Sequence, residues 1–94
     1  MQFQWDREKN RLLKEERNVC FEDVVDLIYR GKVLDIIKHP NREKYPEQKI
    51  YILVLNGYVH MVPFVRTEDE IFLKTIIPSR KMNKLYKGAY DENG

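Results

Sequence analysis

The Asn56-Gly57 pair lies between two apolar runs, Ile50 to Leu55 and Tyr58 to Val65. Both residues of the pair accept the positive φ values of a type I′ turn, which makes it the strongest short-range signal for a β-hairpin. The sequence therefore predicts that the two runs pair as antiparallel strands.

Two more apolar segments extend this hairpin. Val33 to Lys38 is rich in Val, Ile and Leu, and a polar loop over Asn41 to Gln48 separates it from the hairpin. A turn at Thr67 to Glu70 precedes a last strand over Ile71 to Ile77. Successive strands joined by tight turns predict an antiparallel meander.

The first third of the chain carries helical signals after a short strand around Phe3. Asp6 is a good N-cap for a helix over Arg7 to Arg17, and Asn18 ends it because asparagine tolerates left-handed geometry. The second helix is indicated by apolar residues at i, i+3, i+4 and i+7 and is stopped by a glycine. These residues are Phe21, Val24, Val25, Ile28 and Gly31.

The chain closes with a basic helix that Ser79 caps and Gly88 ends. From Pro78 to Tyr90 there are four cations and no acid. An arginine at a strand–helix junction is well placed to bind a phosphate. The four cations are Arg80, Lys81, Lys84 and Lys87.

The predicted order is β-α-α-β-β-β-β-α, which belongs to the α+β class. We expect one domain over residues 1–94, with an antiparallel sheet of about four strands packed on an N-terminal helical hairpin. The short basic helix follows at the C-terminal end. The second sheet face is expected to meet water or a partner.

The composition excludes several classes of protein. The net charge of +2 is too small for a generic polycation, and the single cysteine, Cys20, excludes an internal disulfide. No Cys/His cluster suggests a metal site, and no cofactor is expected. No apolar run approaches membrane-spanning length, and the start of the chain is too polar for a signal peptide. A cytoplasmic protein is expected.

Three segments together resemble the BrnT family of bacterial type II toxins, in the same order along nearly the whole chain. They are Phe3-Gln4-Trp5-Asp6-x-x-Lys9, Val19-x-Phe21-Glu22-Asp23 and Ile76-Ile77-Pro78-Ser79-Arg80.

The resemblance implies a RelE-like fold and a small cytoplasmic ribonuclease that blocks translation by cutting RNA. It also implies a cognate antitoxin with a ribbon-helix-helix DNA-binding part. The toxin–antitoxin complex would repress its own operon, so operator DNA would be met only through the antitoxin.

Metal-free RNA cleavage needs a base for the 2′-hydroxyl, cations around the phosphate and an acid for the leaving oxygen. Arg80 and Arg66 are the candidates for a phosphate clamp, because both follow strands on one side of a simple meander. The alternative for these arginines is an ordinary surface position or an ion pair with Glu68 or Asp69. We expect the cations of the second half of the chain to converge on one concavity.

Further candidates have ordinary structural alternatives. Lys74 is either a cleft ammonium or protection of a strand edge, and Glu47 is either a base or a solvated loop charge. His60 suits acid–base work, but it is also typical of a packed strand residue with one hydrogen bond. The candidate RNA-binding residues are Lys49, Lys81, Lys84 and Lys87.

A second hypothesis is a non-catalytic module of the same fold that binds an antitoxin-like partner or nucleic acid. Many family members have Lys-His-Gly where this chain has Glu16-Arg17-Asn18, and often His-Thr where it has Pro63-Phe64. These differences favour binding without cleavage, whereas Arg66, Lys74 and Arg80 favour the enzyme.

Overall fold

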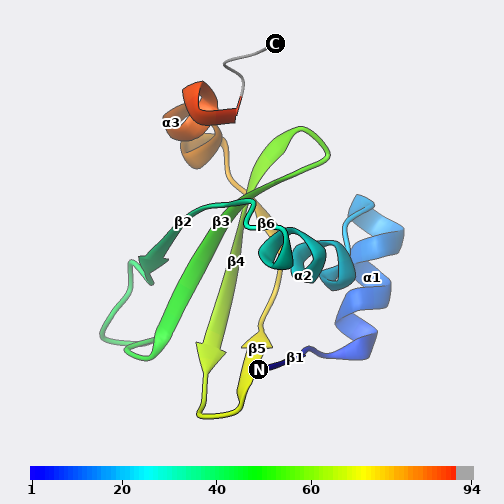
Figure 1. Ribbon diagram of the computed structural model, residues 1–94, viewed down its shortest axis with the longest axis vertical. Helices are drawn as coiled ribbons and strands as arrows, with labels where there is room; N and C mark the ends of the chain where they lie inside the picture. Colours follow the sequence, from blue (N-terminus) through cyan, green and yellow to red (C-terminus); the bar gives the residue numbers. More distant parts are fainter. Residues whose placement is uncertain (91–94) are drawn as a thin grey trace.

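A computed structural model describes residues 1–90, with side chains through residue 88 (Figure 1). Three helices and a six-stranded sheet make up this part of the chain, which confirms the α+β class. In chain order the elements are β1 (Gln2–Gln4), α1 (Arg7–Arg17), α2 (Phe21–Tyr29), β2 (Val33–Lys38), β3 (Gln48–Leu55), β4 (Tyr58–Arg66), β5 (Glu70–Leu73), β6 (Ile77–Pro78) and α3 (Arg80–Tyr90).

The sheet has the strand order β1-β5-β4-β3-β2, and β6 also pairs with β4. Asn56 and Gly57 have φ values of 53° and 73°, so the predicted two-residue turn joins β3 and β4. The expectation of about four antiparallel strands was wrong in two respects. The first strand joins the sheet, parallel to β5, and the last predicted strand is divided into β5 and β6.

Pro63 gives a physical reason for this division. It lies in the central strand β4, and its carbonyl accepts a 2.8 Å hydrogen bond from the backbone N–H of Lys74. Proline cannot donate to the ladder, so the segment opposite it cannot pair regularly. β5 ends at Leu73, and pairing with β4 resumes at Ile77 with the register shifted by one residue.

The N-terminal helices cover one face of the sheet but do not form a simple hairpin, because α2 crosses the sheet at a steep angle to α1 (Figure 1). The main core lies beneath them, where Phe21 and Val24 of α2 are fully buried against β3 and β4. The side chain of Asn10 joins the helices: its Oδ1 accepts from the Phe21 N–H at 2.8 Å, and its Nδ2 donates to Glu22 at 2.8 Å.

α3 covers part of the opposite sheet face, which the sequence left to water or a partner. Met82 and Tyr86 pack against a second apolar cluster that includes Ile52 and Val59. Ser79 caps the helix as predicted, through its Oγ and the Met82 N–H at 3.1 Å. The helix continues past Gly88, where we expected it to end, because this glycine does not adopt the positive φ of a C-cap.

A candidate RNA-binding pocket

A pocket of about 430 Å³ lies at the end of the sheet where β3 begins and β4 ends. This volume is within the 300–1,000 Å³ range of small-molecule sites. Its polar lining comes from both strands, from the residue before β3 and from the turn after β4. The lining residues are Ile36, Glu47, Lys49, Tyr51, Phe64, Arg66, Thr67 and Ile71.

Strand alternation explains why these side chains share one face. Lys49 pairs with Phe64, and Tyr51 pairs with Val62, on the face that also carries α1 and α2. Arg66 is two positions beyond Phe64 and points the same way, because side chains alternate along a strand. The rings of Tyr51 and Phe64 stack with centroids 4.1 Å apart and planes 18° apart. They form an apolar floor beneath the charged rim.

The charged groups of the rim are not neutralised by the protein itself. Glu47, Lys49 and Arg66 are exposed, and none of them forms an ion pair with another described residue. The alternative pairing of Arg66 with Glu68 or Asp69 is therefore not observed. Two cations and one carboxylate remain able to contact a ligand in the same pocket.

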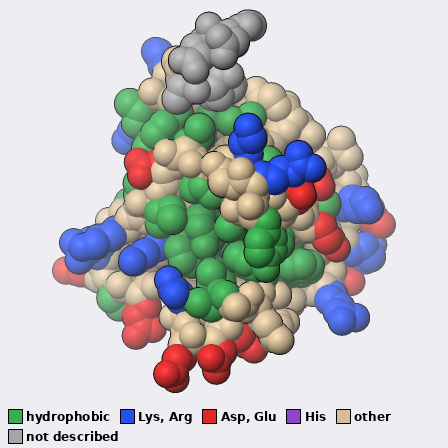
Figure 2. Space-filling model, in the orientation of Figure 1, with side chains coloured by type: hydrophobic (Ala, Val, Ile, Leu, Met, Phe, Trp, Pro, Cys, Tyr) green, Lys and Arg blue, Asp and Glu red, His purple; other side chains and the backbone are tan. Residues whose placement is uncertain are grey.

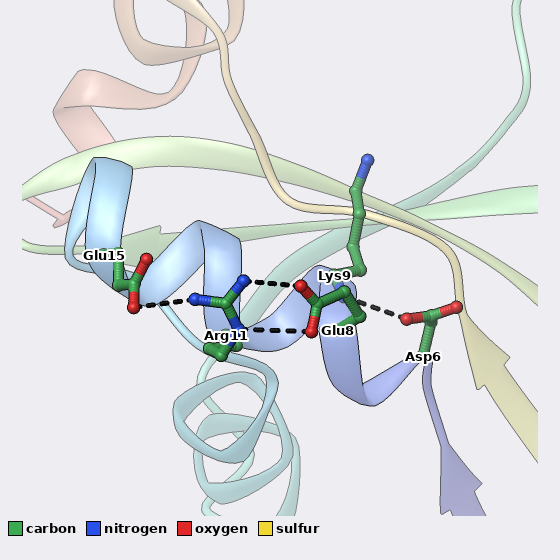
Figure 3. A network of polar contacts seen from close by, with 5 residues as sticks. All are labelled: Asp6, Glu8, Lys9, Arg11 and Glu15. Atoms are coloured by element: carbon green, nitrogen blue, oxygen red, sulfur yellow. Dashed lines mark hydrogen bonds and ion pairs between the residues drawn. The ribbon is translucent and has the colours of Figure 1, made fainter.

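In contrast to the charged residues of the pocket rim, Arg11 of α1 is paired with carboxylates of its own helix (Figure 3). Arg11 lies between Glu8 and Glu15, with N–O distances of 2.5 and 2.8 Å. These hydrogen bonds raise the pKa of Arg11, with Glu8 making the largest contribution. A guanidinium satisfied on both sides by its own helix is a poor ligand for an external phosphate, in contrast to Arg66.

Tyr51 is a pocket residue that the sequence prediction missed. Burial raises the pKa of its phenol, and the nearby positive charge of Arg66 acts in the opposite direction. Its hydroxyl makes no hydrogen bond within the described part of the chain. The signal was available in the sequence: Tyr51 follows Lys49 by two residues on a predicted strand, so both had to share a face.

Arg80 does not meet Arg66. It follows β6, whose Pro78 pairs with His60, whereas Arg66 lies six positions further along β4. Six positions of strand correspond to about 20 Å. The expected clamp by both arginines is therefore not formed, because β6 returns to the start of β4 rather than to its end.

The α3 cations are also remote from the pocket. Arg80, Lys81, Lys84 and Lys87 are exposed on a helix that packs against the opposite sheet face. The expected convergence of all cations on one concavity was wrong. Of the predicted cations, the structure places only Lys49 and Arg66 at the pocket.

Lys74 lies just beyond β5, with Nζ 5.3 Å from the ring centroid of Phe72. These two residues line a separate pocket beside the start of α1, together with Asp6 and Glu8. Lys74 is therefore not mid-strand as predicted, and it is not in the pocket of Arg66.

His60 is buried on β4, and its Nδ1 lies 2.8 Å from the carbonyl oxygen of Tyr58. Burial lowers the pKa of His60, and the charge of Arg17 adds to this effect. The geometry matches the structural alternative, a packed histidine with one hydrogen bond. His60 does not line the Glu47–Arg66 pocket.

Among the residues with described positions, no group of three or more His, Cys, Asp or Glu side chains could hold a metal ion. No helix in the described part of the chain has the length and apolar character required to cross a membrane. Comparisons with protein-family models, curated proteins and solved structures found no match to this chain.

Proposed function

We propose that the chain is an endoribonuclease toxin of a toxin–antitoxin pair and that the Glu47–Arg66 pocket holds the phosphodiester to be cut. One observation carries the proposal: Lys49 and Arg66, both free of ion pairs with described residues, border the same pocket as the carboxylate of Glu47. The toxin class itself is supported by the resemblance of three sequence segments to the BrnT family.

The cations would act on the phosphate. The planar guanidinium of Arg66 matches two phosphate oxygens, and Lys49 adds a second positive charge. Charge builds up on these oxygens as the 2′-hydroxyl attacks phosphorus, so preorganised cations stabilise the transition state more than the bound substrate.

The proton transfers can be assigned to two other pocket residues. Glu47 removes the proton of the 2′-hydroxyl, the 2′-oxygen bonds to phosphorus, and the bond from phosphorus to the 5′-oxygen breaks. The products are a cyclic 2′,3′-phosphate and a 5′-hydroxyl. Tyr51, whose phenol carries a proton at neutral pH, donates it to the leaving 5′-oxygen.

The resemblance extends the proposal to the surroundings of the protein. A cognate ribbon-helix-helix antitoxin would neutralise the toxin, and the complex would reach operator DNA only through that antitoxin. The site of action would be the cytoplasm.

A non-catalytic RNA-binding module is the second candidate. It is favoured by the separation of His60 and Arg80 from the pocket. Without His60 the proton transfers are left to a carboxylate and a phenol, and without Arg80 the expected phosphate clamp lacks one arginine. Such a module would use Lys49 and Arg66 for binding alone, and would meet the same kind of antitoxin-like partner or nucleic acid.

Cleavage by the purified protein tests both candidates, with free RNA and with a translating extract, in the presence of a metal chelator. We expect Arg66→Ala to lower the cleavage rate about 10²- to 10³-fold, the usual effect of removing one oxyanion-stabilising group. Glu47→Gln should abolish cleavage while retaining RNA binding. Arg42→Ala, which removes an exposed cation outside the pocket lining, is the matched control.

The outcomes separate the candidates. Binding that depends on Arg66, without any cleavage by the wild type, would replace the enzyme by the binding module. Neither cleavage nor Arg66-dependent binding would overturn both. Induced expression in bacteria adds a further readout, since wild type should arrest growth and Arg66→Ala should not.

A further inference from the structure

An exposed aromatic residue adjoins the pocket on the same sheet face. Ile71, which lines the pocket, is the neighbour of Phe3 across the β1–β5 pairing. The ring of Phe3 meets the ring of Tyr29 edge to face, with centroids 5.8 Å apart and planes at 74°. Neighbouring strands are ~4.8 Å apart, so Tyr29 is separated from the pocket residue Ile71 by Phe3 alone.

Tyr29 is 72% exposed at the C-terminal end of α2, although its ring contacts that of Phe3. Figure 2 shows apolar side chains gathered over the middle of this face, with Lys and Arg side chains at its left border. Cations beside accessible aromatic rings are the combination by which proteins bind single-stranded nucleic acid.

We propose that Tyr29 stacks on the base of the nucleotide that adjoins the one held in the pocket, which makes unpaired RNA the substrate. The inference rests on the proposed function, because it takes the phosphate position from Lys49 and Arg66. The ring of Phe3 contacts the Tyr29 ring, while the 72% exposure of Tyr29 leaves its side chain accessible to a base. In a duplex, bases are stacked on each other and cannot lie flat on a protein ring, so paired RNA is excluded.

Fluorescence anisotropy tests this with a short labelled RNA that has no self-complementarity and carries 2′-O-methyl groups to prevent cleavage. We expect Tyr29→Ala to weaken binding about 5- to 100-fold, the range of one base–aromatic stack. Tyr29→Trp should retain the wild-type affinity, because an indole also stacks. Leu85→Ala, at an exposed apolar residue of α3, is the control and should change nothing. The same RNA annealed to its complement should bind wild type and Tyr29→Ala equally weakly.

Thermal unfolding of each variant confirms that the fold is retained. Wild-type affinity in Tyr29→Ala, together with weak binding by Arg66→Ala, would overturn the stacking site and leave the proposed function standing. Equal affinity of the wild type for paired and unpaired RNA would also overturn it. Absence of any Arg66-dependent RNA binding would overturn the proposed function and the stacking site together.

Discussion

Tyr86 on α3 donates a hydrogen bond of 2.6 Å from its hydroxyl to Oδ2 of Asp35 on β2. The backbone N–H of Ile36 donates to the other carboxylate oxygen at 2.8 Å. Together with the packing of Met82, this contact fixes α3 over the sheet face opposite the pocket. α3 is therefore held by a side-chain hydrogen bond to β2 as well as by apolar packing.

The Tyr86–Asp35 contact predicts a pH-dependent contribution to stability. The hydrogen bond lowers the pKa of Asp35 from 3.8 and raises that of Tyr86 from 10.0. A lowered carboxyl pKa stabilises the fold above its unfolded value and loses this effect as the pH falls. A raised phenol pKa stabilises below its unfolded value and loses this effect as the pH rises.

Tyr86→Phe should therefore reduce the melting temperature by a constant amount between about pH 5 and 9, with the difference shrinking on either side. Thermal denaturation from about pH 3 to pH 11, which extends beyond both limits, measures this difference. Tyr45→Phe is the control, because the Tyr45 hydroxyl makes no hydrogen bond to the described residues. A difference that is the same at every pH would contradict the assignment.

The half-buried Asn10 is expected to contribute to stability as a helix cap. Cys20 is the N-cap residue of α2 but makes no side-chain capping bond, and Asn10 of α1 satisfies the Phe21 N–H instead. Asn10→Ala should lower the free energy of unfolding by about 1–2 kcal/mol, the usual cost of a lost cap. Urea denaturation measures this, with Arg7→Ala on the same helix as control. Equal effects of the two substitutions would show that the cap is dispensable.

Two glycines form a matched pair for testing the hairpin turn. A Cβ atom would meet nothing within 4 Å at Gly57 or at Gly88, but only Gly57 has a positive φ, of 73°. Gly57→Ala should destabilise the fold by about 1–2 kcal/mol, because of left-handed strain alone. Gly88→Ala should stabilise it by about 0.5–1 kcal/mol, because alanine favours helix. Calorimetry should show opposite signs, and a shared sign would refute the argument.

The lysines of α3 should attract RNA electrostatically without contributing to the cleavage step. Changing Lys81, Lys84 and Lys87 to Gln should weaken RNA binding at low salt, with the difference disappearing at high salt. The cleavage rate at saturating RNA should stay at the wild-type value, because α3 packs on the face away from the pocket. Changing Lys49 to Gln should lower the rate itself. A reduced saturating rate in the triple variant would bring α3 into the site.

The pairing of β3 with β4 at the pocket could be predicted from the hairpin turn. A two-residue turn pairs Leu55 with Tyr58, and continuing the same pairing brings Lys49 opposite Phe64. The same rule places Glu47 near Arg66 at the open end of the strands. The cross-strand pairing within the pocket is therefore a consequence of local turn chemistry, which the sequence shows directly.

The position of Arg80 could not be predicted in the same way. The run from Ile71 to Ile77 has the pattern of one strand, but Pro63 on its partner lacks the N–H that regular pairing would need. That interaction is non-local, so the division of the strand and the return of Arg80 to the start of β4 were not apparent. The cap from Asn10 to α2 was missed because it joins two helices across space.

The amino-acid sequence by itself determined the type I′ turn, the extent of α1 with its Asp6 and Asn18 caps, and the shared face of Lys49 and Tyr51. These depend on backbone preferences and side-chain periodicity within a few residues. Only the tertiary structure decided that Arg80 and Lys74 lie away from Lys49 and Arg66. That outcome depends on strand order and on the face each helix covers, because long-range pairing and burial, rather than local preference, set both.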